Sequence, residues 1–409
     1  MIHRSTRRVR SLLLLAGLAG SLTAAGCGTH GKYTQEHINA AEERMSVLKS
    51  GTEWDLARQA FLAGDLKKAE KKVDISIAHN NEVTKSHVLR GRIMLEQGRM
   101  DQAIASLERA LELDEENVDA HYYLAIVFER LLQRDTALSY YVEAADLDPN
   151  DPQYGVAAAE VMMDMGNVEA AEAFLLSRGD AYRHAAGVRQ TLGHIAMIQE
   201  RPEDAVAMFT EAQLLAPGDN GITEDLIRAQ MATARFGEAE LALTTLLNDE
   251  DFAERRDLQH LRVRCLSALN RPVEARSLLD EMVRGDEGVS DIGAWLALGY
   301  VAIELEDQGR LREASRRVIS LAPNRGEGHF LRAIWLRQME RDDQALIAAQ
   351  EAVRLSPENA DNHLLLGLVL SSLGQEGEAD SSFARAIELD PNNGLARELN
   401  GTVVSAPID

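Results

Sequence analysis

The stretch 360–393, with the sequence ADNHLLLGLVLSSLGQEGEADSSFARAIELDPNN, decides the fold of this chain. An apolar run over residues 362–373 predicts one helix, which is ended by a glycine-rich turn at 374–377. A helical pattern resumes over residues 378–389. Asp390-Pro391 then ends it, because proline has no amide hydrogen with which to continue a helix. The stretch therefore predicts two antiparallel helices joined by a tight turn.

The predicted contact points between the two helices carry small residues, at Gly367, Ala379 and Ala386. Two antiparallel helices can approach closely only where their contact points carry little side chain. The stretch is 34 residues long, and a 34-residue frame laid back from it fits ten repeats over residues 50–393, with slips of two residues at 254–255 and 290–291. The ten repeats, numbered one to ten, start at Ser50, Thr84, Val118, Pro152, Ala186, Asn220, Arg256, Ile292, Gly326 and Ala360.

Two positions of the frame carry the evidence for the repeats. Position 20 is alanine in nine of the ten repeats and Leu311 in the other, and position 8 is glycine or alanine in all but two. Proline closes five repeats. This pattern is similar to the tetratricopeptide repeat, a family with small residues at positions 8, 20 and 27 and a closing proline. The resemblance implies an all-α, right-handed superhelical solenoid of about ten helix pairs, whose first helices line a concave groove.

Repeats six and seven depart most from the pattern. Ile227, Leu246, Val263 and Met282 replace small residues there. Larger side chains at the contact points predict wider helix spacing or a local change in superhelical pitch.

Residues 1–26 predict a signal peptide, with a basic leader and an apolar core over 11–22 that is too short to span a membrane. Small residues then run directly into Cys27. This segment resembles the lipobox of bacterial lipoproteins, although Ala24 stands where that family usually carries leucine. The resemblance implies that Cys27 is lipidated and becomes the first mature residue. The alternative is ordinary secretion, with cleavage near Ala25 and an unmodified Cys27.

The lipoprotein resemblance also implies a location. Several acyl chains hold a protein on a membrane far better than one chain does. Gly28 follows the cysteine, in place of the aspartate that resembles an inner-membrane retention signal. We therefore expect the protein in the cell envelope, anchored by lipid on the periplasmic face of the outer membrane.

The segments that flank the repeats are short. Residues 27–49 are predicted to hold the lipidated cysteine, a tether and, over 33–49, an amphipathic capping helix for repeat one. Residues 394–409 are predicted to form a second capping helix, through Leu395 and Leu399, followed by a frayed tail.

The charge of the chain excludes one class of partner. The formal net charge is −23, and removal of the four arginines of the signal peptide takes it to −27. Such a protein repels a phosphate backbone, so nucleic acid is not an expected partner.

The sequence contains no HExxH, paired CxxC, GxSxG or glycine-rich phosphate loop. Outside the repeats only about 40 mature residues remain, too few for a catalytic domain. We therefore predict no enzymatic activity, no cofactor and no metal. Four histidines form a series at position 4 of their repeats, and packing explains them better than metal binding. They are His87, His121, His329 and His363.

Arginine occupies position 9, a groove position of the family, in two pairs of neighbouring repeats. One hypothesis is that these arginines bind acidic segments of a partner through their forked donors. The other is that each pairs with a glutamate of its own or a neighbouring helix. The four residues are Arg58, Arg92, Arg228 and Arg264.

Apolar and aromatic side chains also fall at the predicted groove. Exposed apolar surface of that extent usually marks a protein or peptide site, whereas the alternative is that the first helices pack more deeply than the frame implies. The candidates are Trp54, Phe61, Tyr122, Leu296, Tyr300, Phe330, Ile334 and Leu368.

These observations predict a non-catalytic scaffold or adaptor, anchored to a membrane, that binds protein or peptide segments in its groove. The resemblance to lipidated envelope adaptors implies a role in pilus, secretion, outer-membrane or polysaccharide-export assembly. Two alternatives stay open: a glycan-binding or glycan-export accessory protein, and a non-catalytic regulator of an envelope enzyme.

Overall fold

The computed structural model describes residues 32–404, and within this range the regular elements are helices without a strand. The chain divides into an N-terminal unit, Met1–Gln133, and a C-terminal unit, Arg134–Asp409. The predicted signal peptide, Cys27 and residues 405–409 lie outside the described residues. Among the described residues, none of the helices combines the length and apolar character needed to cross a membrane.

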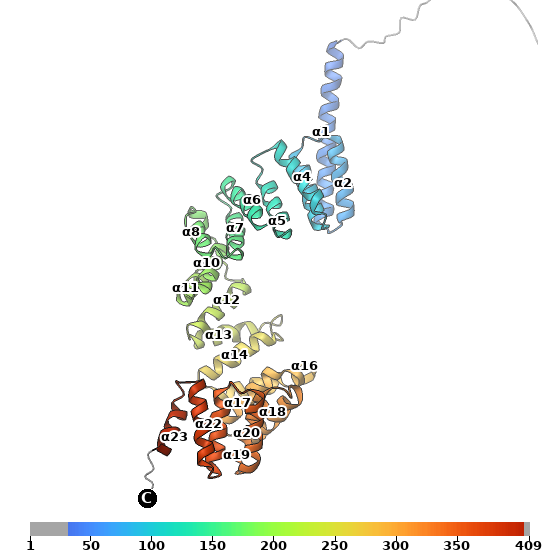
Figure 1. The fold of residues 1–409 in the computed structure, drawn as a ribbon. Helices are drawn as coiled ribbons and strands as arrows, with labels where there is room; N and C mark the ends of the chain where they lie inside the picture. The colour runs from blue at the N-terminus through green and yellow to red at the C-terminus, as the bar shows by residue number, and fades with distance from the viewer. Residues whose placement is uncertain (1–31, 405–409) are drawn as a thin grey trace, which may run out of the picture. The chain divides into compact units, whose positions relative to one another are not determined.

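In the N-terminal unit each helix packs against the next one along the chain, and α3 also contacts α1 and α5. The first and second helices of the repeats alternate in this order (Figure 1). The helices are α1 (Lys32–Leu62), α2 (Leu66–His79), α3 (Thr84–Glu96), α4 (Met100–Leu113) and α5 (Val118–Arg130).

The N-terminal end differs from the expected separate capping helix at 33–49. Helix α1 continues without a break through Lys49 and Ser50, so the capping segment and the first helix of repeat one form one helix of 31 residues. The segment contains no proline, and a lone Gly51 costs a helix only about 1 kcal/mol. The Ser50 hydroxyl is buried against that of Ser76 in α2, which fixes the continuous helix on its neighbour.

The C-terminal unit continues the alternation of first and second helices, with two short additional helices, α9 and α16. Its first eight helices are α6 (Arg134–Leu147), α7 (Pro152–Asp164), α8 (Val168–Leu176), α9 (Asp180–Arg183), α10 (Ala186–Ile198), α11 (Pro202–Leu215), α12 (Asn220–Ala232) and α13 (Phe236–Leu247). The others are α14 (Arg256–Ala268), α15 (Pro272–Met282), α16 (Gly285–Ser290), α17 (Ile292–Glu304), α18 (Gln308–Leu321), α19 (Gly326–Gln338), α20 (Asp342–Leu355), α21 (Ala360–Ser372), α22 (Glu376–Leu389) and α23 (Gly394–Val404).

The helix boundaries follow the 34-residue frame closely. From repeat two to repeat ten, every first helix begins at position 1, and in all ten repeats the second helix begins at position 17. Position 20 is fully buried in each repeat, including Leu311. The predicted all-α repeat fold is confirmed, while the right-handed sense of the superhelix stays a prediction.

Close approach within the pairs depends on glycine at position 8. A β-carbon on Gly193 would lie 2.5 Å from the ring of Phe209, and one on Gly367 would lie 2.5 Å from the ring of Phe383. In both repeats the aromatic ring is at position 24 and is 2% exposed. A small residue on the first helix therefore makes room for a large one on the second.

The second helices of repeats four, six and seven are shorter than the 14 residues found in the others. Repeats six and seven were expected to depart through wider helix spacing or a change in pitch, and the shortening was not predicted for any of the three. In repeat four, Arg178 occupies the small-residue position 27, and the helix ends just before it, at Leu176. The chain resumes in α9, where Tyr182 is 1% exposed and fills the space beside Gly155. In repeat seven, the short helix α16 ends at Ser290, the first of the two extra residues at 290–291.

The C-terminal end extends further than expected. Helix α23 runs to Val404, so part of the predicted tail is helical. Leu399 packs against the buried cluster around Phe383, whereas Leu395 is half exposed and Ala396 is the fully buried residue.

Three of the four histidines at position 4 tie the loops between repeats to the following helix. The ring nitrogens of His87, His121 and His363 donate to the backbone oxygen six residues earlier, at 2.8–2.9 Å. Gln259 makes the same contact at 2.8 Å and Trp295 at 3.2 Å. Different side chains thus perform one structural task at this position. Across residues 32–404, no group of three potential ligands could hold a metal ion.

Candidate interaction surface on the first helices of the repeats

On the first helices of the N-terminal unit, cationic side chains lie over aromatic rings. Trp54 is at position 5 of α1, and the Lys85 ammonium of α3 lies 4.1 Å from the centroid of its ring. The Arg58 guanidinium, one turn further along α1, lies 5.9 Å from the same centroid. The indole nitrogen donates to the Lys85 backbone oxygen at 3.1 Å, which fixes the ring between the two helices.

A second stack continues this arrangement on α3. The Arg92 guanidinium lies 5.0 Å from the ring centroid of Phe61 and 4.6 Å from that of Tyr123. Its Nε atom is buried and makes no hydrogen bond. Burial raises the pKa of Tyr123 above its ordinary value, although Arg92 opposes this, so the phenol stays protonated. Tyr122 packs edge-on against Tyr123, with their centroids 5.3 Å apart.

Within the described part of the chain, no ion pair connects Arg58, Lys85 or Arg92 to a carboxylate. Two other cations of the same unit do form such pairs. Lys72 pairs with Glu53 at 2.8 Å, and Arg90 pairs with Asp74 at 2.9 Å. Internal pairing therefore does not explain the arginines of repeats one and two. Contact with the rings stabilises each cation by about 0.5–2 kcal/mol and leaves its charge without a counterion. We call the seven residues the aromatic–cationic surface: Trp54, Arg58, Phe61, Lys85, Arg92, Tyr122 and Tyr123.

The arginine of repeat six behaves differently. Arg228 pairs with Glu224 and Asp225 of its own helix, both at 3.2 Å. Burial works against the ionisation of Asp225, but hydrogen bonds from His194 and Gln190 outweigh it and hold the pKa of Asp225 below its ordinary value. The carboxylate stays charged, so the internal-pairing hypothesis holds at Arg228.

Two candidates from repeats seven and eight meet at one hollow. Arg264 of α14 and Tyr300 of α17 both line a depression of about 420 Å³, together with Phe236 of α13. Tyr300 is 45% exposed, and its ring centroid lies 6.4 Å from that of Phe330. Burial of part of the side chain raises the pKa of Tyr300, so its hydroxyl remains a donor. The C-terminal unit thus has a second surface that combines an arginine with aromatic side chains.

The remaining apolar candidates fit the deeper-packing alternative. Leu368 is half buried against the core around Phe383. Three others are half buried against the core around Leu331, and these are Leu296, Phe330 and Ile334. They shape the first-helix face without forming an open apolar stripe.

Sequence reasoning missed two members of the aromatic–cationic surface. Lys85 lies at position 2, which is one of the groove positions of the family. A comparison of the residues at position 2 across the repeats would therefore have identified it. Tyr123 lies at position 6, and only its contact with Arg92 in the structure identifies it.

Comparison with known proteins finds the repeat at two places in the chain. A family model described as "TPR repeat" matches residues 91–131, and a model described as "Tetratricopeptide repeat" matches residues 360–393. The chain contains tetratricopeptide repeats. The second match coincides with repeat ten, the stretch from which the frame was built.

Similarity to individual proteins is low and partial. "Protein CTR9 homolog" of Arabidopsis thaliana is 26% identical over 172 residues, which is 40% of this chain and 16% of that protein's length. The solved structure of PilW, described as a widely conserved type IV pilus biogenesis factor, covers 50% of this chain and 95% of its own, with 17% identity and a TM-score of 0.44. PilF of Pseudomonas aeruginosa covers 62% of this chain and 98% of its own, with 18% identity and a TM-score of 0.39.

Proposed function

We propose that this chain is a non-catalytic scaffold of the bacterial cell envelope, which binds a segment of a partner protein on its aromatic–cationic surface. Tetratricopeptide repeat proteins are generally protein-interaction scaffolds. The observation that carries the proposal is the set of three cations, Arg58, Lys85 and Arg92, that lie over aromatic rings without a carboxylate partner. We further propose that the lipobox-like segment anchors the chain through Cys27 to the periplasmic face of the outer membrane.

The composition of the surface suits a protein partner. Tryptophan, tyrosine and arginine are the residues that most often dominate the binding energy of protein interfaces. A partner segment that carries carboxylates next to apolar side chains would supply the missing counterions and cover the rings. Charges more than roughly 8–10 Å from the surface are largely screened at physiological salt, so the acidity of the whole chain does not prevent this contact.

A glycan fits this surface less well than a protein does. Carbohydrate binding would use aromatic ring faces as stacking platforms. Here Trp54 has two cations over its ring, and Phe61 and Tyr123 share Arg92 between them. These cations occupy ring surface that a sugar would need.

Affinity capture from detergent-solubilised membranes tests the proposal, with the full-length chain as bait. We expect a protein partner to be retained by the wild type and lost from the double variant Arg58→Ala/Lys85→Ala. The matched control is Lys72→Ala/Arg90→Ala, which removes two internally paired cations of the same unit and should keep the partner. Recovery of polysaccharide alone, or equal capture by both double variants, would contradict the proposal.

The anchor has a separate test. Cys27→Ser should move the protein from the membrane fraction to the soluble fraction after cell breakage. Continued retention of this variant in the outer membrane would show that the anchor proposal is wrong, without affecting the binding surface.

A further inference from the structure

Helix α18, the second helix of repeat eight, carries an excess of positive charge on a strongly acidic chain. It has four arginines and one glutamate, whereas the whole chain has a formal net charge of −23. Arg310 pairs with Asp280 and with Glu313, both at 3.0 Å, so it uses the single glutamate of the helix. The other three arginines have no ion pair with a carboxylate anywhere in residues 32–404. They are Arg312, Arg316 and Arg317.

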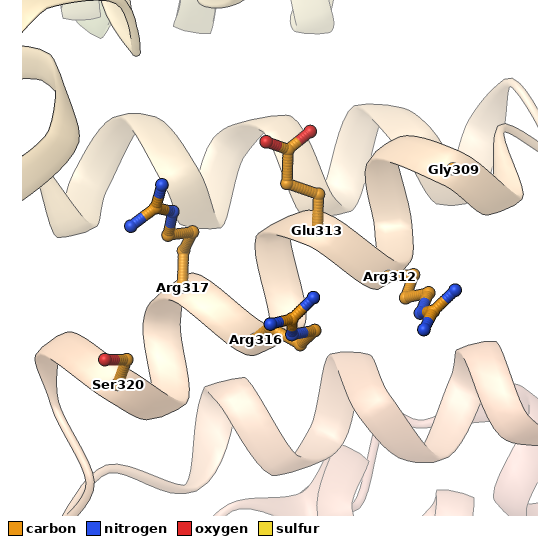
Figure 2. Close-up of a pocket in the computed structure, with 6 residues that line it drawn as sticks. All are labelled: Gly309, Arg312, Glu313, Arg316, Arg317 and Ser320. Atoms are coloured by element: carbon orange, nitrogen blue, oxygen red, sulfur yellow. The ribbon is translucent and has the colours of Figure 1, made fainter.

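These three arginines line one hollow of about 430 Å³ (Figure 2). Figure 2 shows their side chains spaced along α18, with Gly309 near one end and Ser320 near the other. All six lining residues are exposed. The hollow is therefore open to a ligand along its length.

Two of the arginines are held by tryptophans of the neighbouring first helices. The Arg312 guanidinium lies 5.4 Å from the ring centroid of Trp335 in α19. The Arg317 guanidinium lies 5.7 Å from that of Trp295 in α17. Arg316, between them in sequence, has no such ring contact. The rings limit the movement of the Arg312 and Arg317 side chains and leave their hydrogen-bond donors available to a ligand.

This arrangement costs folding free energy without a ligand. Like charges four residues apart on a helix, as at Arg312 and Arg316, repel each other. Glu313 lines the same hollow, but its carboxylate pairs with Arg310 at 3.0 Å. Carboxylates more than about 8–10 Å from the three arginines are largely screened at physiological salt. An anion in the hollow would relieve the repulsion.

We propose that this hollow binds an extended, acidic peptide segment with carboxylates on alternate residues. A rise of 1.5 Å per residue separates Arg312 and Arg316 by about 6 Å along the helix axis. Alternate residues of an extended chain are about 6.6 Å apart on one side, so successive carboxylates match successive guanidinium forks. A nucleic acid would carry its phosphates past the ends of this short patch onto an acidic chain. The proposal is independent of the aromatic–cationic surface.

Fluorescence anisotropy with the full-length protein tests the proposal directly. The probe is a labelled ten-residue peptide of glycine and serine with four glutamates on alternate positions. A second peptide of the same composition has the four glutamates in one block, and inorganic polyphosphate serves as competitor.

The key variant is Arg312→Gln/Arg316→Gln/Arg317→Gln. We expect it to weaken binding of the alternating peptide about 10- to 100-fold, because three exposed ion pairs are lost. The single variant Arg316→Gln should weaken binding less, and within residues 32–404 it removes no ion pair or ring contact. The matched control is Arg109→Gln/Arg354→Gln/Arg385→Gln, which makes the same charge change at arginines paired within their own second helices and should bind like the wild type.

Four outcomes would overturn the proposal. Equal weakening of peptide binding in the control triple variant would show that binding depends only on the net charge of the protein. Unchanged binding by the triple variant would place the peptide elsewhere. Polyphosphate binding more tightly than the peptide, or equal affinity for the block peptide, would reject an extended acidic segment as the ligand.

Discussion

Gly367→Ala tests the close approach of the two helices in repeat ten. In an open helix position this change stabilises by about 1 kcal/mol, because alanine has the higher helix propensity. Here the added β-carbon would lie 2.5 and 2.6 Å from Cε1 and Cδ1 of the Phe383 ring. That ring is 2% exposed and packed on several sides, so overpacking should cost about 1–3 kcal/mol. We therefore expect Gly367→Ala to lower the free energy of unfolding by about 1 kcal/mol.

Gly51→Ala is the matched control, because it also lies within a helix, α1, and its β-carbon would meet nothing within 4 Å. Gly51→Ala should raise the free energy of unfolding by up to about 1 kcal/mol, so the two variants should differ in stability by about 2 kcal/mol. The assay is native-state hydrogen exchange read by mass spectrometry on peptides from each helix. A loss of 1 kcal/mol corresponds to about fivefold faster exchange.

The location of the effect matters as much as its size. In a stack of repeats stability is a sum over neighbouring interfaces, so Gly367→Ala should speed exchange in α21 to α23 and leave α3 unchanged. Adding Phe383→Leu should cost less than the sum of the single variants, because the smaller side chain relieves the overlap. Stabilisation like that of Gly51→Ala would refute the packing argument, and a uniform loss of protection would refute the nearest-neighbour argument.

Three further predictions concern single residues. Burial raises the pKa of the Cys265 thiol to about 11, so iodoacetamide at pH 8 should modify it only as the protein opens; modification as fast as that of a free thiol would contradict this. A hydrogen bond from Arg255 lowers the pKa of Asp257 from 3.8 to about 2, so its contribution to stability is present above pH 4 and is lost as the pH falls towards 2. The stability difference between the wild type and Asp257→Asn, followed by circular dichroism, should therefore shrink over that range, and a constant difference would count against the pairing. Arg228→Ala should leave partner capture unchanged because this arginine is internally paired, and loss of the partner would show that it binds directly.

The sequence was sufficient to place the paired helices of the repeats because the spacing of small residues is a local signal. A 34-residue frame set by glycine and alanine predicts where each pair begins, and proline and glycine mark the ends. Repeat four shows the limit of this reasoning. Its second helix ends before Arg178, and Tyr182 of the next short helix fills the space beside Gly155. That compensation joins residues about 27 positions apart and has no periodic signature.

The binding surface was harder to predict, because the same position has different neighbours in different repeats. Repeats two and six, for example, both have arginine at position 9. Arg228 has carboxylates three and four residues before it on the same helix, and it pairs with both. Arg92 has Val88 and Leu89 at those places and lies between aromatic rings from two other helices instead. Local spacing could have identified the paired arginine, but the contacts of the unpaired one depend on tertiary structure.

Site-specific photo-crosslinking in intact cells can show whether a partner protein lies on the aromatic–cationic surface. Leu62, the last residue of α1, directly follows Phe61 of the aromatic–cationic surface and is 71% exposed. A photoreactive amino acid placed there leaves the aromatic–cationic surface intact. Glu108, an exposed residue on the second helix of repeat two, gives the control position in the same unit. We expect a discrete protein adduct from position 62 that Arg58→Ala/Lys85→Ala abolishes, and none from position 108. Adducts of equal yield from both positions, or an adduct at 62 that survives the double variant, would contradict it.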